Sequence, residues 1–173
     1  MPSEEHRSDG IQSPQSSPKG TIMSIFHPYF RQLSTEGFDG EEDVLWEDEL
    51  TVKGNLVEVS LWAENENRLP TETLDAFAAF LSELEKADDA ARAALTEYLK
   101  RDSRYIDFHT EDTQTSRDAA KFVRTMQLTY ISLWAESPAF AVMDYMPANM
   151  ESDGILAVKL HLDGSIFSID WES

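Results

Sequence analysis

Carboxylates are the residues of this chain with the greatest capacity for chemistry, because they can hold cations, transfer protons or attract basic partners. The chain has 173 residues, with 33 Asp plus Glu against 14 Lys plus Arg, and a formal net charge of −19 at pH 7. Eight of its acids lie within residues 36–49. That run lacks the alternating ligands, the glycine and the final glutamate of a calcium-binding loop. It predicts a solvated acidic surface, and we expect no metal site.

Histidines are the second group of candidates, and the four of them are His6, His27, His109 and His161. None has a second histidine at the spacing of a zinc site. His109 is followed by Glu111 and Asp112, an arrangement similar to a general base with carboxylate partners. One alternative function is therefore a small hydrolase that combines His27 or His109 with a nearby carboxylate, although no complete catalytic set is visible.

The sequence lacks the residues or motifs that several other kinds of catalytic centre require. Without cysteine, the chain has no disulfide framework, thiolate zinc site or cysteine nucleophile. It contains no GxSxG motif, and its seven glycines are too dispersed for a phosphate-binding loop. The sequence favours a protein without a cofactor and without enzymatic activity.

The net charge also selects among partners. Nucleic acids and anionic membranes are bound through Lys and Arg, so a charge of −19 argues against both. No apolar run approaches the roughly 20 residues of a membrane helix. The first 22 residues lack the apolar core of a secretory signal. We expect a cytoplasmic protein.

An acidic surface suits a basic protein partner, because complementary charge accelerates association. The residues suited to this role are the carboxylates Glu41, Glu42, Asp43, Glu47 and Glu49, with Trp62 beside Glu47 as an aromatic anchor. The sequence thus favours a non-enzymatic acidic protein-binding module, and an immunity-type protein that neutralises a basic toxin or nuclease is one form of it.

Three alternatives to this interpretation stay open. The acidity can be a solubility trait, and Trp62 can be a sheet residue covered by the N-terminal segment. The chain can also be an oligomer joined through the edge strand of its final hairpins. The sequence leaves the oligomeric state undetermined.

Residues 1–22 differ in composition from the rest of the chain. They hold five Ser, three Pro and two Gly. Such a segment cannot bury enough apolar surface to offset the entropy of ordering, which predicts a disordered tail. A start of translation at Met23 is an equally good interpretation. Residues 23–173 are long enough for a single domain with its own core.

Local patterns predict the elements that position these residues. Residues 46–63 alternate like a β-hairpin with Gly54-Asn55 as its two-residue loop, which places Leu50 opposite Val59. Helical spacing then begins at Thr71. A second helix is capped by Asp88 or Asp89, and a third starts near Thr115 or Ser116. Residues 102–112 fit either a helix extension or a loop.

From Leu128 onward the apolar period shifts to two. We expect one hairpin from residues 128–135 and 139–146, and another from residues 155–162 and 165–171, in which Leu160 faces Phe167. The order ββ-ααα-ββββ predicts an α+β fold, with an antiparallel sheet of about six strands and helices packed on one face.

The pentapeptide Ser-Leu-Trp-Ala-Glu occurs twice, at residues 60–64 and 132–136. An internal duplication would explain it, but the flanking residues match only at scattered apolar positions. We interpret the repeat as a coincidence between two similar edges, with Trp62 and Trp134 as sheet residues.

Three segments of the chain have a distinctive combination of aromatic and turn residues. They are Phe26–Phe30, the hairpin Leu50–Val59 after the acidic run, and the C-terminal pair Leu162–Ser165 and Ile169–Glu172. Together they resemble a family of small bacterial proteins catalogued only as a domain of unknown function. The likeness spans about residues 24–173. It implies a bacterial cytosolic α+β domain that starts near Met23, and it carries no catalytic residues.

Overall fold

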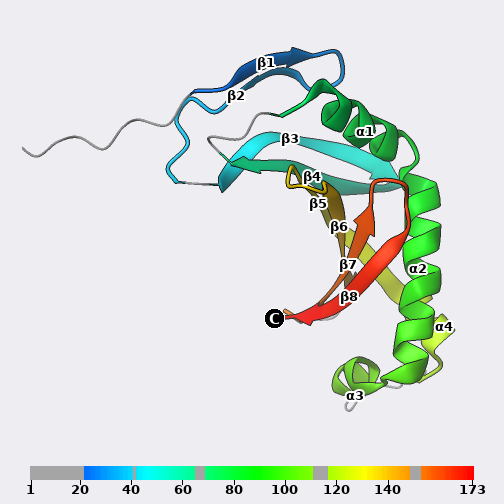
Figure 1. Ribbon diagram of the computed structural model, residues 1–173. Coiled ribbons are helices and arrows are strands. Elements are labelled where there is room, and N and C mark those ends of the chain that lie inside the picture. Colours follow the sequence, from blue (N-terminus) through cyan, green and yellow to red (C-terminus); the bar gives the residue numbers. More distant parts are fainter. Residues whose placement is uncertain (1–21, 41, 65–68, 111–116, 149–152) are drawn as a thin grey trace, which may run out of the picture.

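A six-stranded sheet forms the centre of the computed structural model, which describes residues 22–40, 42–64, 69–110, 117–148 and 153–173 (Figure 1). In spatial order its strands are β3 (Glu42–Val52), β4 (Asn55–Glu64), β5 (Met126–Trp134), β6 (Phe140–Pro147), β7 (Ile155–His161) and β8 (Ile166–Glu172). Neighbouring strands are antiparallel except β4 and β5, which are parallel. The α+β class is confirmed, but the prediction of a wholly antiparallel sheet is wrong, because the chain crosses over through the helices between β4 and β5.

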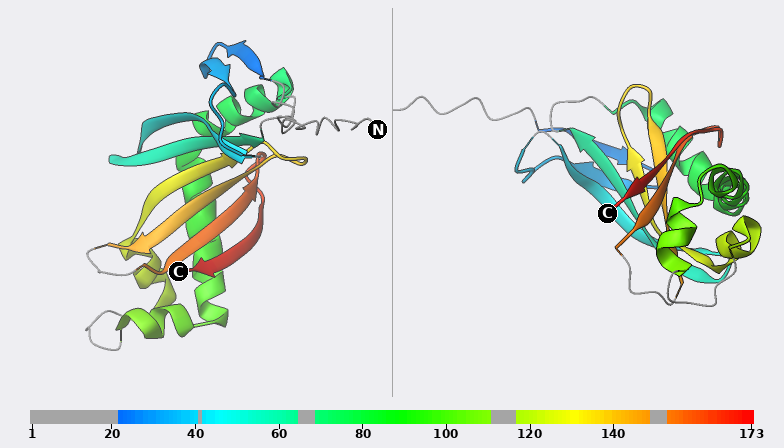
Figure 2. Two further views of the ribbon diagram at one scale, coloured as in Figure 1. Left: turned by 90° about the vertical axis from the view of Figure 1, so that its left-hand side faces the viewer. Right: turned by 90° about the horizontal axis from the view of Figure 1, so that it is seen from below.

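The helices lie on one face of this sheet, as Figures 1 and 2 show. Within the described residues they are α1 (Thr71–Ser82), α2 (Leu84–Arg101), α3 (Arg104–Thr110) and α4 (Ala119–Thr125). One more helix is present than the sequence predicted, because the ambiguous residues 102–112 include α3. The expected start of the third helix at Thr115 or Ser116 lies outside the described residues, and α4 is capped by Asp118, whose carboxylate accepts a hydrogen bond from the Lys121 backbone N–H at 2.8 Å.

A separate two-stranded ribbon precedes the sheet. It consists of β1 (Ser24–His27) and β2 (Arg31–Ser34), where an extended segment or a short turn was expected. Phe30 is almost fully buried and packs edge-on against Trp46 of β3, with ring centroids 4.9 Å apart. The ribbon therefore covers part of β3. The predicted tail, apart from Ile22, lies outside the described residues.

The first hairpin of the sheet turns one residue earlier than predicted. Its loop is Lys53-Gly54, because Val52 pairs with Asn55 and Leu50 pairs with Val57. Both loop residues have positive φ angles, 48° and 85°, as a tight primed turn requires. The register differs from the predicted one by two residues. Each side chain consequently stays on its predicted face, although its cross-strand partner changes.

The last hairpin contains a bulge that redirects one aromatic side chain. Val158 pairs with Ile169 as predicted, but the register shifts between Lys159 and Leu160, so Leu160 pairs with Ile166. The predicted pairing of Leu160 with Phe167 is wrong. Phe167 instead contacts Phe140 on the face turned away from the helices, with ring centroids 5.9 Å apart.

A buried carboxylate connects the helical layer to the sheet. The sequence predicted Asp88 as a helix cap, but α2 begins four residues earlier, at Leu84, because Leu84 and Ala87 belong to the same buried stripe as Ala91 and Leu95. Asp88 thus lies in the first turns of the helix with its side chain 1% exposed. A charge in this position requires partners.

Three elements supply those partners. The Asp88 carboxylate accepts hydrogen bonds from the Arg92 guanidinium at 2.9 Å and the Tyr145 hydroxyl at 2.8 Å, and it pairs with the Lys53 ammonium at 2.9 Å. Arg92 also donates to the carbonyls of Val123 and Met126, each at 3.0 Å. Burial acts to raise the pKa of Asp88, but these hydrogen bonds outweigh it and hold the pKa below its ordinary value.

Replacing Asp88 by Asn is expected to lower the free energy of unfolding at neutral pH by about 3 kcal/mol, since it leaves Lys53 and Arg92 without their buried counter-charge. Because the folded-state pKa is lowered, the contribution of Asp88 is present above the ordinary carboxyl pKa and disappears as the pH falls through the lowered value. Urea denaturation measures both effects.

The matched control is Asp89→Asn, which removes an adjacent carboxylate that also contacts Lys53 but is 72% exposed. It should change the free energy by about 1 kcal/mol or less. Equal destabilisation by the two variants would show that Asp88 is not the connection described here.

Candidate functional site

The sheet face turned away from the helices, which we call the open face, is presented to the viewer in the left view of Figure 2. Cross-strand pairing arranges its central side chains in three rows. The aromatic row is Trp62, Trp134 and Phe140; the small-residue row is Ser60, Ser132 and Val142; the polar row is Glu58, Tyr130 and Asp144. Each row contains one residue from β4, one from β5 and one from β6.

The repeated pentapeptide generates the aromatic row. β4 and β5 are parallel and in register, so Ser60 pairs with Ser132 and Trp62 pairs with Trp134. The two indoles stack with centroids 5.4 Å apart and an interplanar angle of 10°. The two copies therefore lie side by side at the centre of the sheet and not at two edges, and Trp62 and Trp134 are sheet residues as predicted.

Phe140 extends this stack across the neighbouring strand. Its ring lies 6.1 Å from that of Trp134, with an angle of 8° between the planes. Phe167, displaced by the bulge in β8, closes the far end of the row through its edge-to-face contact with Phe140. The result is a continuous aromatic wall on the open face.

A groove lies between the aromatic row and the polar row, above the small-residue row. Ser132 and Val142 are buried between larger neighbours on both sides. Near them a pocket of about 380 Å³ is lined by all three rows and by Glu136, Lys159 and Glu172. A second hollow, lined by Glu47, Asp48, Glu49, Glu58, Val59 and Ser60, continues toward the edge strand β3.

Hydroxyl groups fix the aromatic side chains of the groove, with one exception. The Trp134 indole N–H donates to Ser132 Oγ at 2.8 Å. The equivalent hydroxyl of Ser60 instead accepts a hydrogen bond from the Tyr130 hydroxyl. The Trp62 indole nitrogen is buried and has no partner among the described residues. A buried donor without an acceptor is unfavourable by about 1–3 kcal/mol.

Asp144 is the most strongly perturbed carboxylate of the groove. Burial and the nearby charge of Glu172 raise its pKa to about 6, against a smaller opposing effect of Lys159. Within the described part of the chain, no residue donates a hydrogen bond to its carboxylate. Lys159 pairs instead with Asp170, at 3.0 Å. Asp144 is thus a half-buried anion without a direct partner.

The structure distributes the predicted site residues over two faces. Glu47 pairs with Ser60 and Glu49 pairs with Glu58, which places both on the open face as expected. Glu42, opposite Glu64, lies on the same face, and burial together with Glu136 and Glu64 raises its pKa.

Two of the predicted site residues are placed differently, and one lies outside the described residues. Asp43 pairs with Ala63, a buried residue of the helix-covered face, and its carboxylate accepts a hydrogen bond from the Val44 N–H at 2.8 Å. Trp62 lies on the open face but opposite Val44 and not opposite Glu47, because the observed register of the hairpin pairs Glu47 with Ser60. Glu41 is the residue outside the described ranges.

Sequence reasoning did not select the centre of the groove. Tyr130, Phe140, Asp144 and Lys159 line the pocket, and none of them was proposed as a site residue. The available signal was the alternation in β5 and β6, whose outward positions carry aromatic and charged residues in place of the small polar ones typical of a solvated face.

The two candidate histidines, His27 and His109, are buried. The His27 ring contacts Asp75 of α1 through Nε2 at 3.0 Å, and its Nδ1 accepts a hydrogen bond from the Tyr29 N–H at 3.2 Å. Both ring nitrogens are therefore engaged in holding the ribbon against α1. His109 is buried in α3, where Nδ1 donates to the Tyr105 carbonyl at 2.8 Å. Its predicted partners Glu111 and Asp112 lie outside the described residues.

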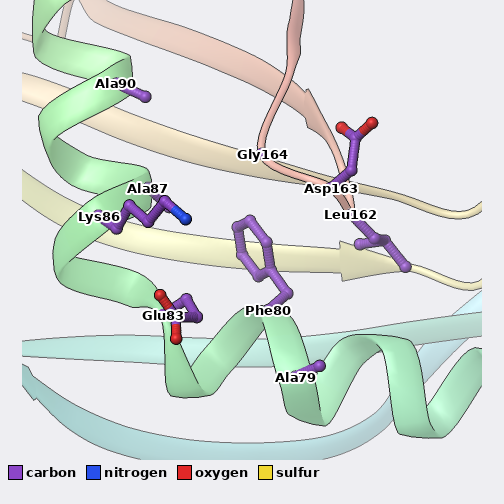
Figure 3. Close-up of a pocket in the computed structure, with 9 residues that line it drawn as sticks. All are labelled: Ala79, Phe80, Glu83, Lys86, Ala87, Ala90, Leu162, Asp163 and Gly164. Atoms are coloured by element: carbon purple, nitrogen blue, oxygen red, sulfur yellow. The ribbon is translucent and has the colours of Figure 1, made fainter.

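Another pocket, of about 240 Å³, lies between the corner of α1 and α2 and the turn from β7 to β8. Figure 3 shows Phe80 and Leu162 facing each other across it, while the carboxylates of Glu83 and Asp163 lie well apart. Its polar groups do not converge, so we select the groove as the candidate site. No group of residues able to hold a metal ion occurs in the described parts of the chain.

Comparison of the chain with protein-family models, curated proteins and solved structures gives no match. Among the described residues, none of the helices has the length and apolar character needed to cross a bilayer.

Asp144→Asn is expected to stabilise the protein at neutral pH. The raised pKa means that folding disfavours the charged carboxylate, and this penalty is complete above about pH 6. A shift of this size corresponds to roughly 2–3 kcal/mol, and screening by solvent reduces the expected gain to about 1 kcal/mol. The gain should shrink as the pH falls from about 6 toward 4 and vanish well below the ordinary carboxyl pKa, at roughly pH 3, where the residue binds a proton in both the folded and the unfolded state.

Urea denaturation of the wild type, of Asp144→Asn and of Asp39→Asn, each at neutral and acidic pH, measures this effect. Asp39 is exposed in the loop before β3 and provides the same chemical change outside the groove. A destabilised Asp144→Asn variant at neutral pH would contradict the assignment of Asp144 as an unpartnered, desolvated anion.

Proposed function

We propose that the protein is a non-enzymatic acidic binding module that docks a basic protein on the open face of its sheet. One observation carries the proposal: an aromatic wall and a set of carboxylates line the same groove. The open-face acids that line its two hollows are Glu47, Glu49, Glu58, Glu136, Asp144 and Glu172, against the single cation Lys159. Because Lys159 is already paired with Asp170, the groove keeps a strong negative charge.

The two components have different roles in binding. Aromatic side chains at the centre of a surface supply most of the binding free energy when a partner covers them. Surrounding carboxylates attract a basic partner over a longer range and disfavour acidic ones. An immunity-type protein that neutralises a basic toxin or nuclease in the bacterial cytoplasm would use both, and this is the form of the function that we favour.

The test uses a variant that neutralises three open-face carboxylates, Glu42→Gln, Glu47→Gln and Glu49→Gln, on β3. Tagged wild type and variant are used to capture proteins from a lysate of the source cells at about 0.05 M and about 0.3 M salt, and association rates are then measured with the purified captured protein. We expect the wild type to retain one basic protein in stoichiometric amount. The variant should associate with it about tenfold more slowly, with a weaker dependence on salt.

The matched control neutralises Glu72, Glu83 and Glu85, which are exposed on α1, between α1 and α2, and on α2. It removes the same charge from the opposite side of the sheet. Retention of the partner by this control and loss by the open-face variant supports the proposal. Equal weakening by both variants would reduce the effect to net charge alone, and the open face would then not be the docking surface.

A further inference from the structure

We propose that the central pocket of the groove binds the side chain of an arginine carried by the basic partner, with the Asp144 carboxylate as the acceptor for its guanidinium group. This inference rests on the proposed function and names the group that the open face recognises. In this inference the residue that selects the partner is Asp144 of β6, and the carboxylates of β3 contribute general attraction for basic proteins.

The position of Asp144 suits a planar cation. Its cross-strand neighbours are Tyr130 on one side and the buried Ala157 on the other, and Asp144 lines the pocket together with Tyr130. Val142, two residues earlier on β6, forms the pocket floor with Ser132. A carboxylate accepts two parallel hydrogen bonds from a guanidinium, which is the strongest geometry available to such a pair.

The potential donors that surround Asp144 form contacts with other residues. Lys159 of β7 lies near it but pairs with Asp170 of β8. Glu172 of β8 adds negative charge, and the hydroxyl of Tyr130 is directed to Ser60. Within the described ranges no donor satisfies the carboxylate. A cation from outside would therefore meet an unpaired anion in a partly desolvated pocket.

The walls of the pocket distinguish arginine from lysine. Trp134 and Phe140 present an apolar surface next to the polar row, along which a three-carbon stem can pack. A guanidinium is planar, stacks against aromatic surface and loses less hydration free energy than an ammonium on entering such a site. Trp62, whose ring stacks on that of Trp134, extends the apolar surface in the same lining.

The experiment uses the full-length protein and three capped tripeptides, acetyl-Gly-Arg-Gly-amide and its counterparts with lysine or citrulline in place of arginine. Binding is followed through the indole and backbone amide signals in ¹H–¹⁵N NMR spectra. We expect saturable shifts for the arginine peptide, concentrated at Trp62, Trp134 and the strands around Asp144. Citrulline keeps the shape without the charge and should give no saturable shift.

Asp144→Asn should weaken binding of the arginine peptide at least about tenfold, because it removes the charged acceptor. Asp39→Asn, the same change outside the groove, should alter the affinity less than about twofold. Both variants are first compared with the wild type by NMR, so that a loss of binding is not mistaken for a loss of fold.

The pH dependence supplies a second measurement. Protonation of Asp144 competes with the cation, so affinity for the arginine peptide should fall as the pH is lowered from about 7 to about 5. The other charged groups near Asp144 are Lys159, Asp170 and Glu172, and they remain in the Asp144→Asn variant. That variant should therefore show a much flatter pH profile than the wild type.

The outcomes separate this inference from the proposed function. If a basic protein is captured through the open face while the arginine peptide binds nowhere saturably, the arginine assignment is wrong and the binding module stands. Equal affinity for the lysine peptide, or full binding by Asp144→Asn, would also overturn the assignment. Saturable binding of the arginine peptide at Asp144 supports it, even if the capture experiment finds no basic protein and the proposed function fails.

Discussion

The buried charge of Asp88 is the contact on which the arrangement of the layers depends. It connects α2 to the turn between β3 and β4, to β6 through Tyr145 and, by way of Arg92, to the end of α4 where β5 begins. The hydrogen bonds and the ion pair of Asp88 are directed contacts, so they add orientation to the non-directional apolar packing between α2 and the sheet. α2 is thereby held against both parts of the sheet, the β3–β4 hairpin and the strands β5 and β6.

The two faces of the sheet use their polar groups in opposite ways. On the helix-covered face Asp88 is fully partnered and its pKa is lowered. On the open face Asp144 is less buried yet unpartnered, and its pKa is raised to about 6. A carboxylate of the first kind stabilises the fold, and one of the second kind reduces stability unless something binds it. This contrast, more than the total number of acids, distinguishes a structural charge from a candidate binding residue.

The sequence predicted most elements because their apolar periods are strong, and it failed where a single residue departs from its usual role. The α+β class, the six strands of the main sheet and their outward faces follow from alternation. Lys53 adopts a positive φ that glycine or asparagine normally occupies, so the first turn was misplaced by one residue. Asp88 is of a residue type that often caps helices, but it lies inside α2 with a buried side chain. That position depends on packing and could not be predicted from the local sequence.

The candidate site was predicted in part, for a physical reason. Glu47, Glu49 and Trp62 were placed on one face because they belong to one hairpin, in which a register error of two residues leaves each side chain on its own face. Asp144 belongs to another hairpin, and its proximity to Trp62 arises from the parallel pairing of β4 with β5, which local pattern does not encode. Among 33 acids, one carboxylate becomes notable only when its neighbours in space are known.

The parallel junction between β4 and β5 also has a consequence for folding. The β3–β4 hairpin and the β5–β8 meander can each form from contacts close in sequence, but their junction closes a long loop that contains all four described helices. Since Trp62 and Trp134 come from the two sides of that junction, the aromatic wall assembles only when the halves join. The groove is therefore a property of the completed fold, and a partly folded chain would not display it.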